Sequence, residues 1–135
     1  MFETKLVIVV REDLATWQKL NVTAFLATGL AAANPEIIGA PYQDANGNSY
    51  NPLSGQPMII LSANGNTLSN IHKRALSRNV PSALYIEEMF STGHDAANRA
   101  VFAEYGSDDA KVVGIAIRAD KKIADKITKG AKMHP

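Results

Sequence analysis

Four short apolar runs, separated by longer stretches of mixed polarity, dominate the hydrophobic pattern of this chain. The runs cover residues 5–10, 57–63, 82–90 and 112–117. Continuous apolar runs of this length are typical of strands that are covered on both faces. The run at 82–90 also alternates enough to suggest one less covered face. The pattern therefore predicts four strands.

A helical repeat fills the interval after the first strand. In residues 22–33 the apolar side chains fall at i, i+3, i+4, i+7, i+8 and i+11, which makes one continuous stripe. Asn21 is a suitable N-cap, and the Asn34–Pro35 pair stops the helix. The polar residues 11–21 are therefore expected to form the connection from strand to helix.

Two later helices follow the same logic. Thr67 is expected to cap a helix at 68–79, with His72 at the edge of its buried stripe as a boundary histidine. Asp120 is expected to cap a last helix, with Gly130 where a C-terminal cap would stand. The buried stripe of the helix at 68–79 is expected to contain Leu68, Ile71, Ala75 and Leu76.

Residues 35–57 interrupt this alternation and predict a hairpin arm. Asn46 and Gly47 form a typical hairpin turn, with Tyr42 and Tyr50 on its two arms. Alternate oxygen-bearing residues in this turn resemble the start of a calcium loop. The required glycine and bidentate glutamate are absent, so the turn interpretation is preferred. A segment of this length is often a lid or a binding loop.

Strand and helix alternation predicts a single α/β domain over residues 1–135. The expected architecture is a three-layer α/β/α sandwich around a small four-stranded mixed or mostly parallel sheet, with the hairpin arm as an insertion at about 35–57. Ligand sites in such sheets lie beyond the carboxyl ends of strands. Two polar stretches, 11–21 and 92–99, follow strands one and three and are expected to face one another.

Composition narrows the classes of protein and partner. The chain has 135 residues, 46% of them hydrophobic and 20% charged, as in soluble globular proteins. A formal net charge of +1 argues against broad electrostatic capture of nucleic acid. The absence of cysteine excludes disulfides, thiolate catalysis and cysteine-ligated zinc. With no membrane span and no secretory leader in the pattern, we expect a cytoplasmic protein.

The richest candidate chemistry lies in residues 90–102. Gly93 is expected to supply a turn with positive φ, and Thr92 or Asp95 to cap the helix that follows. Asp95, Asn98 and Arg99 would then share one helical face. An open helix N-terminus with these polar groups predicts a site for an anionic or carbonyl group.

Several of these motifs resemble known families. The start of the chain, residues 5–14 with Lys19, is similar to that of type-II peptidyl-tRNA hydrolases, and the later order of elements fits their fold. The motifs at residues 17–25, 42–47 and 90–100 resemble those of the bacterial domain-of-unknown-function family DUF2000. This second resemblance covers nearly the whole chain. That resemblance implies the hydrolase-like fold without an assigned activity.

The catalytic motif of the type-II hydrolases is mostly replaced. Their Lys-Gly-Lys corresponds here to Lys19-Leu-Asn, and Phe25 and Thr28 stand where they carry glutamine and histidine. Glu88 and Thr92 are the candidates for their aspartate and threonine. The resemblance therefore implies a fold, while shared folds do not transfer an activity.

Three functions remain open from the sequence. A divergent ester or amide hydrolase would use His94 as a base, oriented by Asp95 or Glu88, and Lys19 as a polariser. Thr92 is a weaker nucleophile candidate. A non-catalytic module would instead bind a small acyl- or nucleotide-like ligand, and tRNA is only weakly supported. The candidate ligand-binding residues are Trp17, Asn21, Tyr42, Gly93, Asn98 and Arg99.

The third function is a homodimeric interaction protein that uses the hairpin arm as its contact. Each candidate residue also has a purely structural interpretation as a cap, a surface ion pair or a packing residue. The three histidines show no ligand spacing, so neither a metal nor another cofactor is expected.

Overall fold

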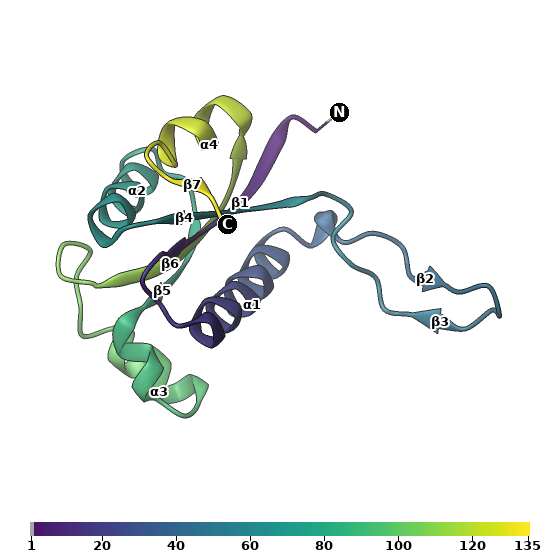
Figure 1. Cartoon of the computed structure of the whole chain (residues 1–135), viewed down its shortest axis with the longest axis horizontal. Helices are drawn as coiled ribbons and strands as arrows, with labels where there is room; N and C mark the ends of the chain where they lie inside the picture. The colour runs from purple at the N-terminus through teal and green to yellow at the C-terminus, as the bar shows by residue number, and fades with distance from the viewer. Residues whose placement is uncertain (1) are drawn as a thin grey trace.

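The computed structural model describes residues 2–135 and shows a sheet flanked by helices, with one long arm (Figure 1). The strands are β1 (Thr4–Arg11), β2 (Tyr42–Gln43), β3 (Ser49–Tyr50), β4 (Met58–Ala63), β5 (Ser82–Ile86), β6 (Val112–Asp120) and β7 (Lys132–Met133). The α-helices are α1 (Thr16–Ala33), α2 (Gly65–Ser77), α3 (Asp95–Phe102) and α4 (Lys121–Ile127). Two 3₁₀-helices are η1 (Pro35–Ile37) and η2 (Glu87–Ser91).

The main sheet is mixed and has five strands in the order β5-β6-β1-β4-β7. β1 and β4 are parallel, whereas the other three neighbouring pairs are antiparallel. The predicted mixed sheet is confirmed, but its strand count was one too low and its neighbours are mostly antiparallel. The missed strand, β7, has only two exposed residues, so no hydrophobic run marks it.

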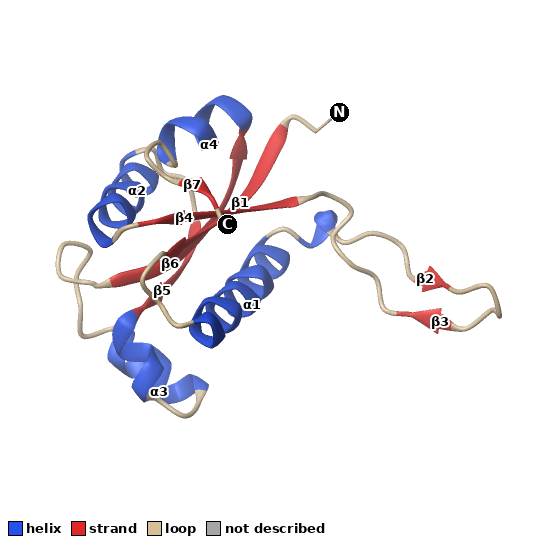
Figure 2. Ribbon diagram, in the orientation of Figure 1, coloured by secondary structure: helices blue, strands red, loops and turns tan. Residues whose placement is uncertain are grey.

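Alternate side chains of β1 enter opposite cores, as the pleat of a strand requires. Leu6 and Ile8 pack with residues of α1 on one face of the sheet. Val7 and Val9 pack with residues of α2 and α4 on the other face. Figure 2 shows this division, with α1 on one side of the sheet and α2 and α4 on the other. The α/β layering predicted from the sequence is therefore present.

The first helix begins earlier than its apolar stripe. α1 starts at Thr16, so Asn21 lies inside the helix and the prediction that it is an N-cap was wrong. The side chain of Gln18 instead accepts a hydrogen bond from the backbone N–H of Ala15, at 3.0 Å. Val22 is the first residue of α1 that the sheet buries. The stripe thus marks where packing against the sheet begins, six residues after the start of the helix.

Two details of α2 also differ from prediction. Its N-cap is Asn64, whose side chain accepts from the backbone N–H of Thr67 at 2.9 Å, so Thr67 is not the cap. Leu76 was expected in the buried stripe but is 50% exposed.

The third predicted strand ends at Ile86, and its last residues form η2 instead. Asp120 occupies the N-cap position of α4 without a capping side-chain hydrogen bond.

His72 is buried rather than placed at a boundary, with only 6% of its surface exposed. Burial, followed by the charge of Lys73, lowers the pKa of His72 below its ordinary value of 6.5. The folded state therefore favours the neutral ring, and unfolding at low pH takes up a proton. Stability from this group is complete above about pH 6.5 and is lost as the pH falls through the lower folded-state pKa.

We expect the thermal midpoint to fall between pH 7 and pH 5 more steeply in the wild type than in a His72→Leu variant. Leucine fills the buried position with an apolar side chain and removes the titratable imidazole. Circular dichroism melts at several pH values measure this slope. A His134→Leu variant is the matched control and should keep the wild-type slope. Equal slopes for wild type and His72→Leu would contradict the assignment.

The hairpin arm is present as predicted. β2 and β3 pair antiparallel, with Tyr42 opposite Tyr50. Gly47 has a φ of +85° in the turn, a conformation that side chains with a Cβ rarely adopt. Figure 1 shows the arm extending away from the sheet and helices.

Candidate functional site

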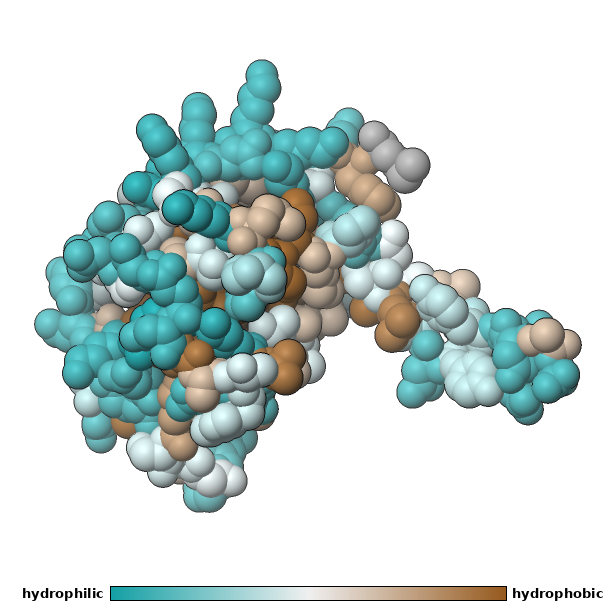
Figure 3. All heavy atoms as spheres, viewed as in Figure 1, coloured by the Kyte–Doolittle hydropathy of each residue, from teal (hydrophilic) through white to brown (hydrophobic). Residues whose placement is uncertain are grey.

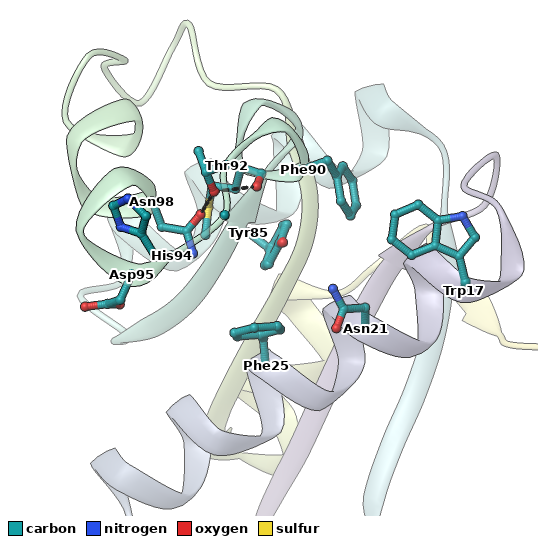
Figure 4. A pocket seen from close by; sticks show the side chains of 11 residues that line it. Trp17, Asn21, Phe25, Tyr85, Phe90, Thr92, His94, Asp95 and Asn98 are labelled. Atoms are coloured by element: carbon teal, nitrogen blue, oxygen red, sulfur yellow. Dashed lines mark hydrogen bonds between the residues drawn. The ribbon is translucent and has the colours of Figure 1, made fainter.

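A pocket lies between the N-terminal half of α1 and the segment formed by η2 and α3 (Figure 4). Its volume is about 330 Å³. Eleven residues line it: Trp17, Asn21, Phe25, Tyr85, Met89, Phe90, Thr92, Gly93, His94, Asp95 and Asn98. The two polar stretches that the sequence analysis expected to face one another do meet here.

Sheet topology explains this meeting. β1 and β5 are each antiparallel to β6, which lies between them, so their carboxyl ends are at the same edge of the sheet. α1 follows β1 and η2 follows β5 at that edge. An ion pair joins the two connections, because Arg11 donates from Nη2 to Oε1 of Glu87 at 2.8 Å. Arg11 also donates from Nε to Asp13, at 2.6 Å.

Aromatic side chains form one wall of the pocket. The Trp17 and Phe90 rings meet edge to face, with centroids 6.0 Å apart and planes at 71°. The ring centroids of Phe90 and Tyr85 are 5.2 Å apart, and those of Tyr85 and Phe25 are 5.9 Å apart. Offset and edge-to-face contacts at these distances are favourable for aromatic rings. These contacts hold the four rings in one row, in which Trp17 and Phe25 remain 61% and 51% exposed.

Polar groups line the pocket on both sides: Thr92 and Asn98 on the side of η2 and α3, and Asn21 on the side of α1. The Thr92 hydroxyl donates to the carbonyl of Met89 at 2.9 Å and is also hydrogen-bonded to the side chain of Asn98. Within residues 2–135, the amide of Asn21 makes no side-chain hydrogen bond, and Figure 4 shows it between the rings of Trp17 and Phe25. Asn21 therefore presents a free donor and a free acceptor to the pocket.

His94 is the N-cap of α3, so the predictions that Thr92 or Asp95 caps this helix were wrong. Its Nδ1 accepts a hydrogen bond from the backbone N–H of Ala97 at 3.2 Å. An accepting Nδ1 carries no proton, which leaves the proton of the neutral ring on Nε2. The prediction that Gly93 has positive φ was also wrong, and the chain enters α3 through His94 in an extended conformation.

The first turn of α3 already carries a negative charge. Asp95 accepts from Nε of Arg99 at 2.8 Å, and both side chains are mostly exposed. This hydrogen bond raises the pKa of Arg99 above its ordinary value. Arg99 lies outside the pocket, on an adjoining hollow that it shares with Phe102. The helix end is therefore capped and acidic, which disfavours the anionic ligand that the sequence analysis expected.

Besides Arg99, three other candidates lie away from the pocket: Lys19, Glu88 and Tyr42. Lys19 is two residues from both Trp17 and Asn21, which places it on a different side of α1. Glu88 lies in η2, does not line the pocket, and has a buried carboxylate oxygen without a hydrogen-bond partner. Tyr42 is on the hairpin arm.

Four lining residues were not predicted from the sequence to bind a ligand: Phe25, Tyr85, Met89 and Phe90. For Phe25 a signal was present. Trp17, Asn21 and Phe25 are spaced by four residues, which places them along one face of a helix that starts early enough to include all three. Placing the helix start at residue 22 concealed that face.

Comparisons with known proteins show which family the chain belongs to. The family model described as "Protein of unknown function (DUF2000)" matches residues 4–135. The chain belongs to the DUF2000 family. The DUF2000 chain is also similar to the solved structure of Atu0240, a protein of unknown function from Agrobacterium tumefaciens strain C58. Identity is 59%, coverage is 100% of both chains, and the TM-score is 0.98. A comparison with curated proteins found no match.

Among residues 2–135, no three His, Asp or Glu side chains gather as potential ligands of a metal ion. Over the same residues, none of the helices combines the length and apolar character needed to cross a bilayer.

Proposed function

We propose that this DUF2000 protein binds a small, planar, uncharged ligand of the nucleobase or nucleoside type, without turning it over. The observation that carries the proposal is the combination of an aromatic wall with the unpaired amide of Asn21 in one pocket. The volume of about 330 Å³ is at the lower end of small-molecule sites.

The aromatic wall favours a flat ligand. Trp17 and Phe25 expose ring surface to the pocket, and Phe90 and Tyr85, which also line it, contact those two rings. Stacking of a base on an aromatic side chain contributes about 1–3 kcal/mol and tolerates different bases, because every base has a π face. A row of fixed rings also loses little conformational entropy on binding.

The polar groups favour an uncharged hydrogen-bonding edge. An asparagine amide offers one donor side and one acceptor side, the pattern with which asparagine pairs to the edge of adenine. Asp95 is the one acidic side chain that lines the pocket, and no lysine or arginine lines it. A phosphate would therefore meet a negative charge and a capped helix end, so the nucleoside is preferred to the nucleotide.

Catalysis is not part of the proposal, because each candidate catalytic group either makes a structural hydrogen bond or ion pair or does not line the pocket. The Thr92 hydroxyl is bonded to Met89 and Asn98 rather than to a base. His94 uses Nδ1 as a helix cap. Hydrolysis needs a nucleophile or water with a base in reach and a group that orients the base, and the described contacts supply no such chain.

The test is a titration of the protein with adenosine, followed by tryptophan fluorescence. Trp17 is the single tryptophan in the chain and lines the pocket, so a ligand bound there should change its emission. We expect adenosine to change the emission saturably, and an Asn21→Leu variant to bind about tenfold more weakly, since one hydrogen bond contributes roughly 0.5–1.5 kcal/mol.

Asn70→Leu supplies the matched control, because Asn70 is an exposed asparagine on α2. It should bind adenosine as the wild type does. Adenosine monophosphate should bind no more tightly than adenosine, and inorganic phosphate should leave the emission unchanged. Tighter binding of the monophosphate would favour an anionic ligand instead. No response to adenosine, cytidine or guanosine would contradict the proposal.

Two finer assignments stay proposals. We propose that the sheet order and helix placement correspond to the type-II peptidyl-tRNA hydrolase fold, on the resemblance of residues 5–14. We also propose a cytoplasmic location in a bacterial cell, which fits a chain without cysteine. Superposition on a solved type-II hydrolase tests the first, and fractionation of cells that express the protein tests the second.

A further inference from the structure

The hairpin arm is ordered within itself but lies apart from its own body. Residues 38–51 are all exposed. At its tip the Asp44 carboxylate accepts hydrogen bonds from the backbone N–H groups of Asn46 and Asn48, from the Asn48 amide and from the Tyr50 hydroxyl. Hydrogen bonds from Asn48 and then Tyr50 lower the pKa of Asp44 to about 2.

Backbone hydrogen bonds join the two segments at the base of the arm. Gly39 donates to the carbonyl of Leu53 at 2.9 Å, and Gly55 donates to the carbonyl of Ile37 at 2.7 Å. Figure 3 shows the arm standing clear of the body, with hydrophobic side chains where it joins the body. A two-stranded hairpin alone is marginally stable in water, so an arm held out in this way is suited to packing on another surface.

The outer face of α1 is a second surface without a partner. Trp17, Leu20, Ala24 and Thr28 follow one another at helical spacing and are all exposed, Leu20 by 68%. The hydroxyl of Thr28 is already satisfied, because it donates to the carbonyl of Phe25 at 2.6 Å. This stripe carries no charge.

Charge is scarce on both surfaces. Lys19 is the single charged residue of α1 and lies on the side away from Trp17. Asp44 is the single charged residue between positions 38 and 55, and its oxygens are occupied within the arm. Depletion of charge together with exposed aromatic and aliphatic side chains distinguishes the core of a protein interface from ordinary surface.

We infer that the arm of one copy packs along the exposed α1 stripe of a second copy, and that the reciprocal contact forms a two-fold symmetric dimer. Two copies related by a two-fold axis satisfy both unpartnered surfaces at once, because each copy offers one arm and one stripe. The arm and the stripe together supply about 20 residues a side, the size of a standard interface.

The contact also touches the pocket without depending on it. Trp17 belongs both to the stripe and to the pocket wall, so the partner's arm would lie beside the mouth. Dimerisation does not require the ligand proposed above. The two inferences can therefore fail separately.

Sedimentation velocity over a range of protein concentrations is the primary test. We expect the wild type to sediment at twice the 14.5 kDa mass of the chain. Leu20→Asp should weaken association at least tenfold by placing a charge in the stripe, and replacing residues 41–51 by a short glycine turn should do the same. Leu76→Asp is the matched control, an exposed leucine on α2, and should leave the dimer unchanged.

Crosslinking tests the pairing of arm and stripe directly. The chain has no cysteine, so single Ala24→Cys and Tyr50→Cys variants each carry one thiol. After the two are mixed and allowed to exchange, a short bismaleimide should join Ala24→Cys chains to Tyr50→Cys chains in preference to like pairs. A monomeric wild type, a dimer insensitive to Leu20→Asp, or crosslinks only between like variants would overturn the inference.

Discussion

A Gly114→Ala substitution should lower the free energy of unfolding by about 2 kcal/mol, the middle of the usual range for overpacking a core. Gly114 lies in β6, directly beneath α1. A Cβ built at this position would lie 2.5 Å from Cγ1 of Val22 and 2.9 Å from Cδ1 of Leu26. Both are buried side chains in the core under α1, so neither has room to turn away.

The compensating gain is small. Alanine is preferred to glycine in a strand by roughly 0.5–1 kcal/mol, which the steric conflict exceeds. Urea denaturation followed by circular dichroism measures the change. Gly93→Ala is the matched control, since nothing lies within 4 Å of its Cβ position and its φ is not positive. It should be neutral or slightly stabilising. Equal stability of the two variants would contradict this view of the α1 contact.

The strands were predictable because burial on both faces leaves a direct mark in the sequence. Residues 7–10 pair with residues 114–117 at the centre of the sheet, and all of these residues are buried. β7 has no such mark, because it pairs with β4 over two residues and its Met133 is 70% exposed. The hydrophobic runs also could not predict which neighbouring strands are parallel and which antiparallel, since a run of apolar residues does not indicate the direction of its strand in the sheet.

Helix ends were less predictable, because capping depends on which side chain reaches a free N–H. For α2, both Asn64 and Thr67 have a suitable acceptor atom, and the backbone geometry makes Asn64 the cap. For α3, the backbone geometry makes His94 the cap. Placing α1 six residues too late followed from the same problem. The stripe that begins at Val22 records contact with the sheet and gives no information about the solvent-facing turn before it.

The location of the candidate site was predictable, whereas its chemistry was only partly so. Polar stretches after strands one and three pointed to one edge of the sheet, and the pocket lies there. Its aromatic wall could not be foreseen, because Tyr85 and Phe90 belong to a run that the pattern assigned wholly to a strand. The change to η2 after Ile86 is what turns Phe90 toward Trp17.

Phe90 should therefore be the position at which ligand binding is most sensitive to the loss of an aromatic ring. We expect Phe90→Leu to weaken adenosine binding by about 10- to 100-fold, the equivalent of roughly 1–3 kcal/mol for one stacking contact. Phe90 contacts both Trp17 and Tyr85, so its removal also releases the exposed tryptophan ring from its position. Leucine keeps much of the buried volume, which preserves the fold.

Isothermal titration calorimetry is the appropriate measurement, because the substitution changes the surroundings of Trp17 and hence its fluorescence. Phe2→Leu is the matched control: Phe2 is a partly exposed phenylalanine that lines a different hollow near the N-terminus. It should bind adenosine with wild-type affinity. Should Phe90→Leu keep that affinity while melting as the wild type does, the four aromatic rings would serve core packing alone, and ligand recognition would have to rest on the side chains of Asn21, Thr92 and Asn98.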